Sequence, residues 1–495
     1  MAKNLMILGT ASTVGKSIIT AAFCRIFKHE GYKTAPFKSQ NMALNSYVTQ
    51  DGLEMGRAQV VQAEAAGIVP IVEMNPILLK PTSDVGSQVI LNGKVFKNMK
   101  AFDYFAYKNE LKPVIMKAYE VLDKSFDVIV MEGAGSPAEI NLRENDIVNM
   151  GMAEMVDAPV ILVGDIDKGG VFAALYGTIM LLEPEERKRI KGYIINKFRG
   201  DVTILQSGLD LFYQKIPIPC LGVIPFMPLS IDDEDSVTTR FNQKGQGDLR
   251  IGIIRLPYMT NFTDFTVFDM EADVSVAYIQ EENLEDFDLI VLPGSKNTLK
   301  DMAYIHNSGL ARKIYSAHRQ GTPIMGICGG YQMLGLSISD PFGVETQDII
   351  INGLGLLNAG TIMSLEKTTV QMNGRLEVPL EFVENLNDMA VKGYEIHMGT
   401  TELHEGTRPA ILLEDGRWDG AVNETGNVFG TYLHGIFDNN AFRNALLNTI
   451  RVKKGLLEQE SVDYEMFKET EYDRLAELVR SHVDLEKIKE IAGIE

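Results

Sequence analysis

The stretch NLMILGTASTVGKS, residues 4–17, decides the fold of the first half of the chain. Lys3–Leu8 is mostly apolar and predicts a buried strand, and Lys16–Lys28 has the pattern of a helix. Between them, glycines at positions 9 and 15 allow tight turns in which backbone N–H groups can surround phosphate oxygens. The order strand, glycine-rich loop, helix therefore predicts a phosphate-binding loop.

This loop predicts a nucleotide site with a magnesium ion. We expect Lys16 to reach the terminal phosphates and the Ser17 hydroxyl to bind Mg²⁺. The expected nucleotide-binding residues are Gly9, Thr13, Gly15, Lys16 and Ser17. Magnesium needs further oxygen ligands, and Glu132, at the end of the strand-like run DVIVMEGAG, is the first candidate. Asp51 is the second candidate, followed by Asp165 and Asp167; an acid at a strand end also commonly caps a helix.

The loop is longer than usual. Five residues, Thr10 to Val14, separate its two glycines, where four are normal. This spacing resembles that of the dethiobiotin synthetase group, and the resemblance implies that ATP activates a carboxylate. A glycine-rich turn without a nucleotide is the alternative.

Composition limits the class of protein. The chain has 495 residues, enough for two or three domains, and is 45% hydrophobic and 23% charged, as soluble globular proteins are. Its net charge of −20 argues against nonspecific binding to nucleic acid or to an anionic membrane. The run of 18 or more apolar residues that a membrane span needs is absent from the sequence. The three cysteines lack metal-ligand or disulfide spacing, which fits a reducing cytoplasm.

Short apolar runs alternate with helix-like stretches in both halves, which predicts an α/β protein of two domains. The expected strands are Asn4–Leu8, Val128–Met131, Val160–Val163, Tyr193–Ile195, Leu221–Ile224, Ile251–Ile254, Leu289–Leu292 and Pro323–Ile327. We expect a P-loop domain with a parallel sheet over residues 1–231 and a polar linker over 232–249. A second α/β domain would follow over 250–450, and residues 451–495 would form a helical tail, most simply one amphipathic helix.

A second motif, GICGGYQMLG at residues 326–335, places Cys328 between an expected strand and an expected helix at Tyr331–Leu336. Small neighbours are needed at such a nucleophile elbow because it is sterically crowded. A helix N-terminus favours the thiolate. The expected oxyanion- and glutamine-binding residues are Gly294, Ser295, Gly329 and Gln332.

A thiol nucleophile needs a base. His434, in GTYLHGIFD, follows an apolar segment and is the preferred candidate, with His397 as its competitor. The other five histidines lie in polar surroundings and are expected at the surface. Cys24 and Cys220 are expected to be small core residues.

Cys328, the segment LPGSKNT and His434 resemble a class I glutamine amidotransferase domain. That class usually has a glutamate two residues after the histidine, where this chain has Ile436; Glu395 is the candidate for a third triad member. The same loss is typical of the cobyric acid and cobyrinic acid diamide synthases.

Further strings resemble the cobyric acid synthase family over about residues 4–450. They include KSQNMALNSYVT at 38–49, EMGRAQ at 54–59, EGAGSPAEINL at 132–142, GDIDKGGVFA at 164–173, NKFRGD at 196–201, NFTDF at 261–265 and GYEIHMG at 393–399. The resemblance implies that ATP, Mg²⁺ and glutamine serve to amidate four peripheral carboxylates of a corrinoid, adenosylcobyrinic acid a,c-diamide. The basic substrate-binding candidates in the matching segments are Lys38, Arg57, Lys80 (in a further matching string, MNPILLKP at 74–81), Lys168 and Arg199. Asp146, in ENDIVNM, is a separate candidate for positioning the substrate or assisting the acyl-phosphate chemistry.

Two alternatives differ from this reading. One is the sibling cobyrinic acid a,c-diamide synthase, against which the strings at 38–59 and 164–173 argue. The other is a P-loop regulatory ATPase with an inactive glutaminase-like domain, against which the presence of Cys328 and His434 argues. The sequence leaves the oligomeric state open, a homo-oligomer included.

Overall fold

The structure is a computed structural model, and it describes residues 1–83, 86–229, 247–346, 350–383 and 388–494. The chain divides into two compact units, and neither unit is one continuous stretch. The first unit comprises residues 1–43, 54–237 and 468–495, and the second comprises residues 44–53 and 238–467. Most of the expected linker, residues 232–249, lies outside the described residues. Among the helices of the described ranges, none is long and apolar enough to cross a membrane.

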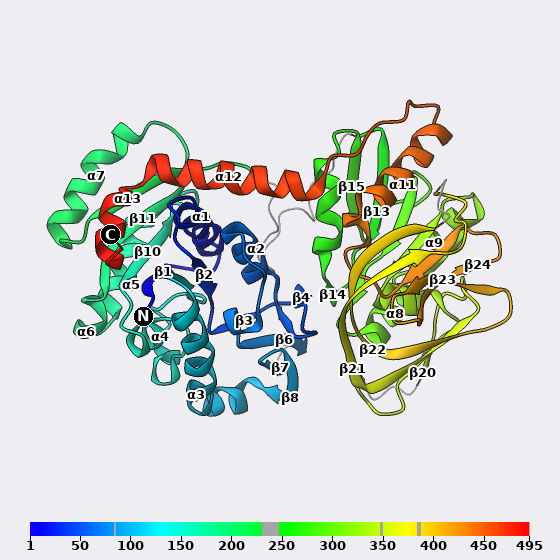
Figure 1. Cartoon of the computed structure of the whole chain (residues 1–495), viewed down its shortest axis with the longest axis horizontal. Coiled ribbons are helices and arrows are strands. Elements are labelled where there is room, and N and C mark those ends of the chain that lie inside the picture. Colours follow the sequence, from blue (N-terminus) through cyan, green and yellow to red (C-terminus); the bar gives the residue numbers. More distant parts are fainter. Residues whose placement is uncertain (84–85, 230–246, 347–349, 384–387, 495) are drawn as a thin grey trace. The chain divides into compact units, whose positions relative to one another are not determined.

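A parallel sheet forms the core of the first unit, with strand order β12-β11-β10-β1-β9-β2 (Figure 1). Its strands are β1 (Lys3–Gly9), β2 (Thr34–Phe37), β9 (Val128–Glu132), β10 (Val160–Asp165), β11 (Ile190–Phe198) and β12 (Cys220–Pro225). The five strands expected in this half are all present, each extended at one or both ends. The central strands are buried on both faces and consist of continuous apolar runs, as is typical of parallel sheets, whereas the edge strand β12 is partly exposed.

Helices follow the strands of this sheet and cover it. They are α1 (Lys16–His29), α2 (Arg57–Ala66), α3 (Ala101–Ser125), α4 (Met150–Met155), α5 (Val171–Leu181), α6 (Pro184–Arg187) and α7 (Val202–Lys215). A separate four-stranded sheet has the order β3-β6-β7-β8. Its strands are β3 (Gln40–Met42), β6 (Ile77–Ser83), β7 (Gly86–Leu91) and β8 (Lys94–Lys100), and the short strand β5 (Glu54–Gly56) leads into α2.

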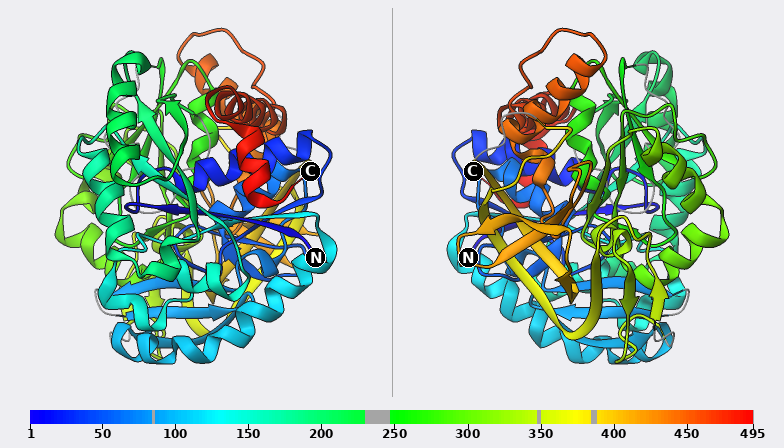
Figure 2. Two further views of the ribbon diagram at one scale, coloured as in Figure 1. Left: turned by 90° about the vertical axis from the view of Figure 1, so that its left-hand side faces the viewer. Right: turned by 90° about the vertical axis from the view of Figure 1, so that its right-hand side faces the viewer.

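The C-terminal region forms two helices, α12 (Tyr464–His482) and α13 (Leu485–Ala492), where one was expected. Val483 pairs with Gly222 of β12 and Asp484 caps α13 by accepting a hydrogen bond from Lys487 N, so the chain turns there. Apolar residues of both helices enter the core of the first unit, among them Leu475 and Ile488. Both chain ends therefore lie in this unit, close together in Figure 2.

The second unit is built on a larger sheet. Its strand order is β15-β13-β16-β18-β25-β24-β23-β21-β19-β20, with β22 paired to β21. The strands are β13 (Leu249–Ile254), β15 (Val274–Ile279), β16 (Leu289–Leu292), β18 (Ile324–Ile327), β19 (Ser337–Ser339), β20 (Ile350–Asn352), β21 (Ala359–Leu376), β22 (Met389–Leu403), β23 (Thr407–Leu413), β24 (Trp418–Asn423) and β25 (Val428–Thr431). The run from β15 to β25 is parallel, and β24 then begins an antiparallel part.

Shorter elements complete the second unit. They are β4 (Ser46–Val48), the pair β14 (Met259–Thr260) and β17 (Gly294–Ser295), the 3₁₀ helices Phe262–Met270 and Ile436–Asp438, and the helices α8 (Thr298–Asn307), α9 (Leu310–Arg319), α10 (Gly329–Leu334) and α11 (Asn440–Lys453). The helix expected at Tyr331–Leu336 thus begins two residues earlier, immediately after Cys328. α11 continues past residue 450, which was the expected end of this domain.

Candidate functional site

The loop between β1 and α1 has the geometry of a phosphate-binding loop. Gly15 has φ of 98°, which favours glycine, and a Cβ there would overlap the Asn196 side chain. The buried Lys16 ammonium donates hydrogen bonds to the carbonyls of Ala11, Ser12 and Gly135, at 2.9, 3.2 and 3.1 Å. The lysine is therefore held over the loop, where its charge can meet the terminal phosphates of a nucleotide.

Glu132, at the carboxyl end of β9, is the centre of a buried polar cluster beside this loop. Its Oε1 accepts hydrogen bonds from Ser17 Oγ and Lys38 Nζ, both at 2.8 Å, and its Oε2 accepts one from Gln62 Nε2 at 2.6 Å. Register explains the proximity, because Glu132 pairs with Ile7 on β1, next to the strand that enters the loop. The Ser17 hydroxyl and the Glu132 carboxylate are thus adjacent oxygen donors of the kind that Mg²⁺ prefers.

The other metal candidates are not gathered at this cluster. Asp51 is exposed and belongs to residues 44–53, which pack with the second unit. Asp165 pairs with Lys197 at 2.8 Å, and Asp167 pairs with Arg199 at 2.9 Å. Within the described ranges, no group of three His, Cys, Asp or Glu side chains has the arrangement of a metal site.

The basic candidates for substrate binding differ in their burial and in their partners. Lys38 and Lys80 are buried in ion pairs with Glu132 and Glu54, at 2.8 and 2.9 Å. By contrast, Lys168 is exposed and donates a hydrogen bond to Thr13 Oγ1 in the phosphate loop at 2.9 Å. The remaining two are Arg57, which is buried at the start of α2, and Arg199, whose guanidinium carbon lies 3.6 Å from the centre of the Phe226 ring.

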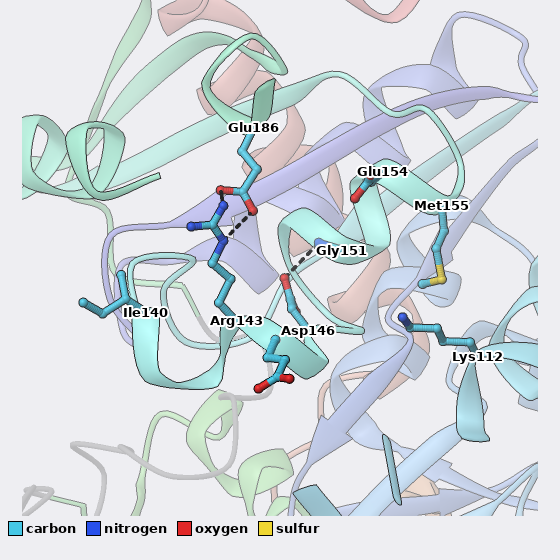
Figure 3. Close-up of a pocket in the computed structure, with 9 residues that line it drawn as sticks. Lys112, Ile140, Arg143, Asp146, Gly151, Glu154, Met155 and Glu186 are labelled. Carbon is cyan, nitrogen blue, oxygen red and sulfur yellow. Dashed lines mark hydrogen bonds and ion pairs between the residues drawn. The ribbon is translucent and has the colours of Figure 1, made fainter. Parts of the chain in front are cut away.

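Asp146 lines a cavity of about 710 Å³ with Lys112, Arg143 and Glu154 among its neighbours (Figure 3). Its carboxylate accepts three backbone hydrogen bonds of 2.9 Å, from Val148, Asn149 and Gly151, and so fixes the turn into α4.

The turn that Asp146 fixes connects to the phosphate loop. Asn149 Oδ1 accepts a hydrogen bond from Ala134 N at 3.1 Å, and Asn149 Nδ2 donates one to Ala134 O at 2.7 Å. The next residue, Gly135, supplies one of the carbonyls that hold Lys16. Asp146 therefore braces the loop after Glu132 through Asn149.

In the second unit, Cys328 lies on a strained turn between β18 and α10. Its φ of 51° and ψ of −110° are unusual for a residue with a side chain, and such strain is typical of a nucleophile elbow. The glycines make the turn possible: a Cβ on Gly330 would overlap the Leu292 carbonyl, and one on Gly326 would lie 2.7 Å from Gly330 C. The thiol faces the Ile396 carbonyl at 3.6 Å.

The segment Gly294–Ser295 lies against this turn. A Cβ on Gly329 would be 2.9 Å from Ser295 N, so the two backbones are closely packed. The Ser295 hydroxyl donates to Asp301 Oδ2 at 2.5 Å, and burial raises the Asp301 pKa to about 7. This packing places a second backbone segment beside the thiol, as an oxyanion site requires.

Gln332, on α10, is held by partners on both ends of its amide. Its Oε1 accepts from Thr298 Oγ1 at 3.1 Å, and its Nε2 donates to Met398 O at 3.1 Å and to the Tyr432 hydroxyl at 3.3 Å. These hydrogen bonds fix the orientation of the amide.

His434 is the histidine that the structure brings to Cys328. The Asp264 Oδ2 is 2.7 Å from His434 Nδ1, and Asp264 Oδ1 accepts a hydrogen bond from Gly435 N at 3.0 Å. Burial lowers the His434 pKa, but the Asp264 carboxylate and the Cys328 thiol outweigh that effect and raise the pKa to about 10. The Asp264 carboxylate thus favours the protonated form of the His434 imidazole.

Asp264 is the functional residue that sequence reasoning missed. Glu395, the candidate for the third triad member, forms an ion pair with Arg417 at 2.8 Å. The expectation that Glu395 contacts the histidine His434 is therefore wrong. Asp264 comes from the 3₁₀ helix Phe262–Met270, far from the histidine in sequence. The string NFTDF, noted only as a family resemblance, was the available signal.

The competing histidine and the other cysteines have structural roles. His397 stacks on Tyr432, with ring centres 3.7 Å apart, and its Nδ1 contacts Gly399 O. Cys24 is fully buried in the core of the first unit, and burial raises its pKa far above the usual value. Cys220 is only partly buried, on β12 at the edge of the sheet.

Comparison with known proteins assigns a domain family to each half of the chain. Residues 5–236 match the CobQ/CobB/MinD/ParA nucleotide binding domain, and residues 250–442 match the CobB/CobQ-like glutamine amidotransferase domain. A cobyric acid synthase of Clostridium acetobutylicum is 53% identical over 498 residues, which cover 99% of this chain and 99% of that protein. The chain belongs to the cobyric acid synthase family.

Further relatives in this family match over their full length. A cobyric acid synthase of Clostridium botulinum is 53% identical over 100% of both chains, and one of Alkaliphilus metalliredigens is 52% identical over 98% of this chain and 99% of its own. The protein is accordingly an ATP-dependent amidoligase with a glutamine amidotransferase domain, and the family's place is in cobalamin biosynthesis.

Solved structures resemble the chain only distantly. A glutamine amidotransferase from Thermotoga maritima has a TM-score of 0.28 at 17% identity, covering 49% of this chain and 98% of its own. The signal recognition particle receptor FtsY from Elizabethkingia anophelis, in complex with GDP, has a TM-score of 0.28 at 15% identity, covering 46% of this chain and 58% of its own.

Proposed function

We propose that the protein amidates the b, d, e and g carboxylates of adenosylcobyrinic acid a,c-diamide, using one ATP and one glutamine for each amide. The observation that supports this proposal is the grouping of two sets of candidate residues in a chain with full-length relatives of one family. Lys16, Ser17 and Glu132 form one site, and Cys328 with the His434–Asp264 pair forms the other.

ATP is needed because a carboxylate is a poor electrophile and hydroxide is a poor leaving group. A substrate carboxylate oxygen attacks the γ-phosphorus, the bond to ADP breaks, and an acyl phosphate forms. Lys16 is positioned to bind the charge that develops on the transferred phosphoryl group. Ammonia then attacks the acyl carbon, phosphate leaves, and the amide remains.

Ser17 and Glu132 would hold Mg²⁺, because their oxygens are neighbours at 2.8 Å in a buried site. The ion neutralises phosphate charge when it is bound. Lys38 and Gln62 already orient the Glu132 carboxylate through hydrogen bonds, so the ligand is preorganised.

Cys328 releases ammonia from glutamine. Its thiolate attacks the side-chain amide carbon of glutamine, and the carbon–nitrogen bond breaks as the His434 imidazolium gives its proton to the leaving group. Water then attacks the glutamyl thioester, with the neutral imidazole taking a proton, and glutamate and the thiolate are released. The Gly329 N–H, with a donor from Gly294 or Ser295, would stabilise the oxyanion of both steps. Gln332 would help to bind glutamine.

Substrate recognition is assigned to the basic residues of the first unit. The corrinoid carries several carboxylates, and guanidinium and ammonium groups bind such groups through charge-assisted hydrogen bonds. The candidates remain Lys38, Arg57, Lys80, Lys168 and Arg199, and Asp146 would act through the turn that it fixes.

Three variants separate the two half-reactions. Cys328→Ala should lose amidation with glutamine but regain it with added ammonia, and Lys16→Ala should lose amidation from both nitrogen sources. Lys33→Ala, at an exposed lysine of the same unit, should behave as the native protein does.

The acceptor is tested in parallel with cobyrinic acid and its a,c-diamide. Amidation of the diamide supports the proposed substrate. Amidation of cobyrinic acid alone would assign the sibling reaction, and ATP hydrolysis without an active glutaminase would favour the regulatory ATPase.

A further inference from the structure

Residues 44–53 form a short excursion of the chain with unusual contacts. The residues before and after them belong to the first unit, but this segment packs with the second. Val48 is fully buried in a small cluster with Tyr394 and Ile396 of β22. We refer to residues 44–53 as the 44–53 segment.

The segment fixes the turn that carries Asp264. Asn45 Oδ1 accepts a hydrogen bond from Phe262 N, and Ser46 N donates one to Asn261 Oδ1, both at 3.0 Å. Asn261 has φ of 50°, a conformation that a non-glycine residue keeps only when its neighbours hold it. These contacts set the start of the 3₁₀ helix from which Asp264 reaches His434.

The segment also fixes Tyr394, which lies on the catalytic histidine. The Tyr394 hydroxyl donates to Ser46 O at 3.1 Å, and its ring stacks on His434 with centres 5.3 Å apart and planes 20° apart. The backbones of Tyr394 and His434 exchange hydrogen bonds of 2.9 and 3.2 Å. The centre of the Tyr47 ring, in the same segment, lies 5.4 Å from the centre of the Tyr394 ring.

The chain on either side of the segment leads to the nucleotide site. Lys38, which precedes it, and Gln62, which follows it on α2, both donate hydrogen bonds to Glu132. Asn75 ties these flanks together, because its Oδ1 accepts from Gly56 N at 3.0 Å and its Nδ2 donates to Lys38 O at 3.1 Å. The two flanks of the segment thus share Glu132 as a hydrogen-bond acceptor.

We propose that the 44–53 segment positions the His434–Asp264 pair and makes glutamine hydrolysis depend on the occupancy of the nucleotide site. The coupling rests on the proposed function, in which unneeded hydrolysis of glutamine wastes ammonia. Two contacts at His434 support this coupling. The turn at Asn261 positions the Asp264 carboxylate against His434 Nδ1, and the Tyr394 ring stacks on the imidazole ring.

Tyr394→Phe tests the proposal, because it keeps the ring on His434 and removes only the hydroxyl that contacts Ser46. Glutamine hydrolysis is measured in the full chain with and without MgATP and the corrinoid diamide. We expect the native protein to be stimulated, and the variant to lose about tenfold in stimulated kcat with an unchanged KM for glutamine. Tyr315→Phe is the matched control, since its hydroxyl donates to Leu354 O within the same unit.

Asn45→Ala gives an independent test from the segment itself. It should lower stimulated glutamine hydrolysis as Tyr394→Phe does, and both variants should slow alkylation of Cys328 by iodoacetamide at neutral pH while leaving ammonia-driven amidation intact. Native stimulation that survives in both variants would overturn the proposal. Equal native rates with and without ligands, alongside normal amidation, would overturn the coupling but not the proposed function; failure of ammonia-driven amidation would overturn the function.

Discussion

Asp264 is the closest charged partner of His434 in the candidate glutaminase site, and it raises the pKa of that histidine. Its carboxylate is buried against His434 Nδ1, and the same carboxylate holds the backbone at Gly435, so it fixes both the proton and the position of the imidazole. Cys328, on its strained backbone turn, then faces a histidine whose orientation Asp264 fixes. We therefore expect the three residues to act as one unit.

Asp264→Asn should lower the kcat of glutamine hydrolysis by roughly 10²- to 10⁴-fold, because the neutral amide no longer stabilises the imidazolium. Ammonia-driven amidation should be unchanged, which separates this effect from unfolding. Asp269→Asn, at an exposed position of the same 3₁₀ helix, is the matched control and should retain activity. A glutaminase that tolerates Asp264→Asn would contradict the triad.

The pair should also make stability depend on pH. Because the folded-state pKa of His434 is raised from 6.5 to about 10, the stabilisation is complete below the lower value and is lost as the pH rises through the higher one. The native protein should therefore exceed His434→Gln in thermal unfolding midpoint at pH 6, and the difference should shrink towards pH 10. A difference that grows with pH would contradict the assigned charge state.

At the scale of elements, the carboxyl ends of β1 and β9 create the nucleotide site. Parallel pairing places Glu132 beside the phosphate loop, and α1 begins directly with Lys16 and Ser17. The Glu132 carboxylate accepts hydrogen bonds from Ser17 on α1, from Gln62 on α2 and from Lys38 in the chain after β2. One acidic side chain thus connects these three parts of the first unit.

Glu132→Gln should raise the Mg²⁺ concentration needed for half-maximal amidation by at least about tenfold, since the amide is a weaker ligand. Glu139→Gln, at an exposed glutamate of the loop that follows β9, should leave the Mg²⁺ requirement unchanged. The requirement is measured by Mg²⁺ titration with ammonia as the nitrogen source, which avoids any effect on the glutaminase. Equal titration curves for the two variants would exclude Glu132 as a ligand.

The local sequence pattern predicted most of the elements that form the two candidate sites. The strand, the glycine-rich loop and the helix around Lys16 depend on residues that are neighbours in sequence, and the same holds for the turn at Cys328. Asp264 could not be assigned, because its partner is determined by tertiary packing of a distant 3₁₀ helix. The break between α12 and α13 was also missed, since it depends on pairing of Val483 with Gly222 rather than on helical periodicity.

The packing of α12 gives a stability prediction. Leu475 is 1% exposed in the core of the first unit, so Leu475→Ala should cost about 2–5 kcal/mol in the free energy of unfolding. Leu457→Ala, at a leucine that is 86% exposed, should cost little. Denaturant unfolding of the two variants measures the difference, and equal midpoints would contradict the docking of α12 on that core.

At the scale of the whole molecule, the chain order crosses between the two units more than once. Residues 44–53 leave the first unit to join the second, and residues 468–495 return to the first. Composition predicted one domain boundary, at a single linker. The packing of a ten-residue segment on the other unit could not be predicted, because it does not change the local periodicity of the sequence. The 44–53 segment was visible only as part of a family string.

We propose that this chain moves the amide nitrogen of glutamine onto a corrinoid carboxylate with the help of ATP. The most direct measurement is mass spectrometry of adenosylcobyrinic acid a,c-diamide after incubation with the protein, MgATP and amide-¹⁵N-labelled glutamine. The account predicts a stepwise gain of four labelled amides, absent in Cys328→Ala and restored there by labelled ammonia. An unmodified corrinoid, in a preparation that hydrolyses both glutamine and ATP, would contradict it.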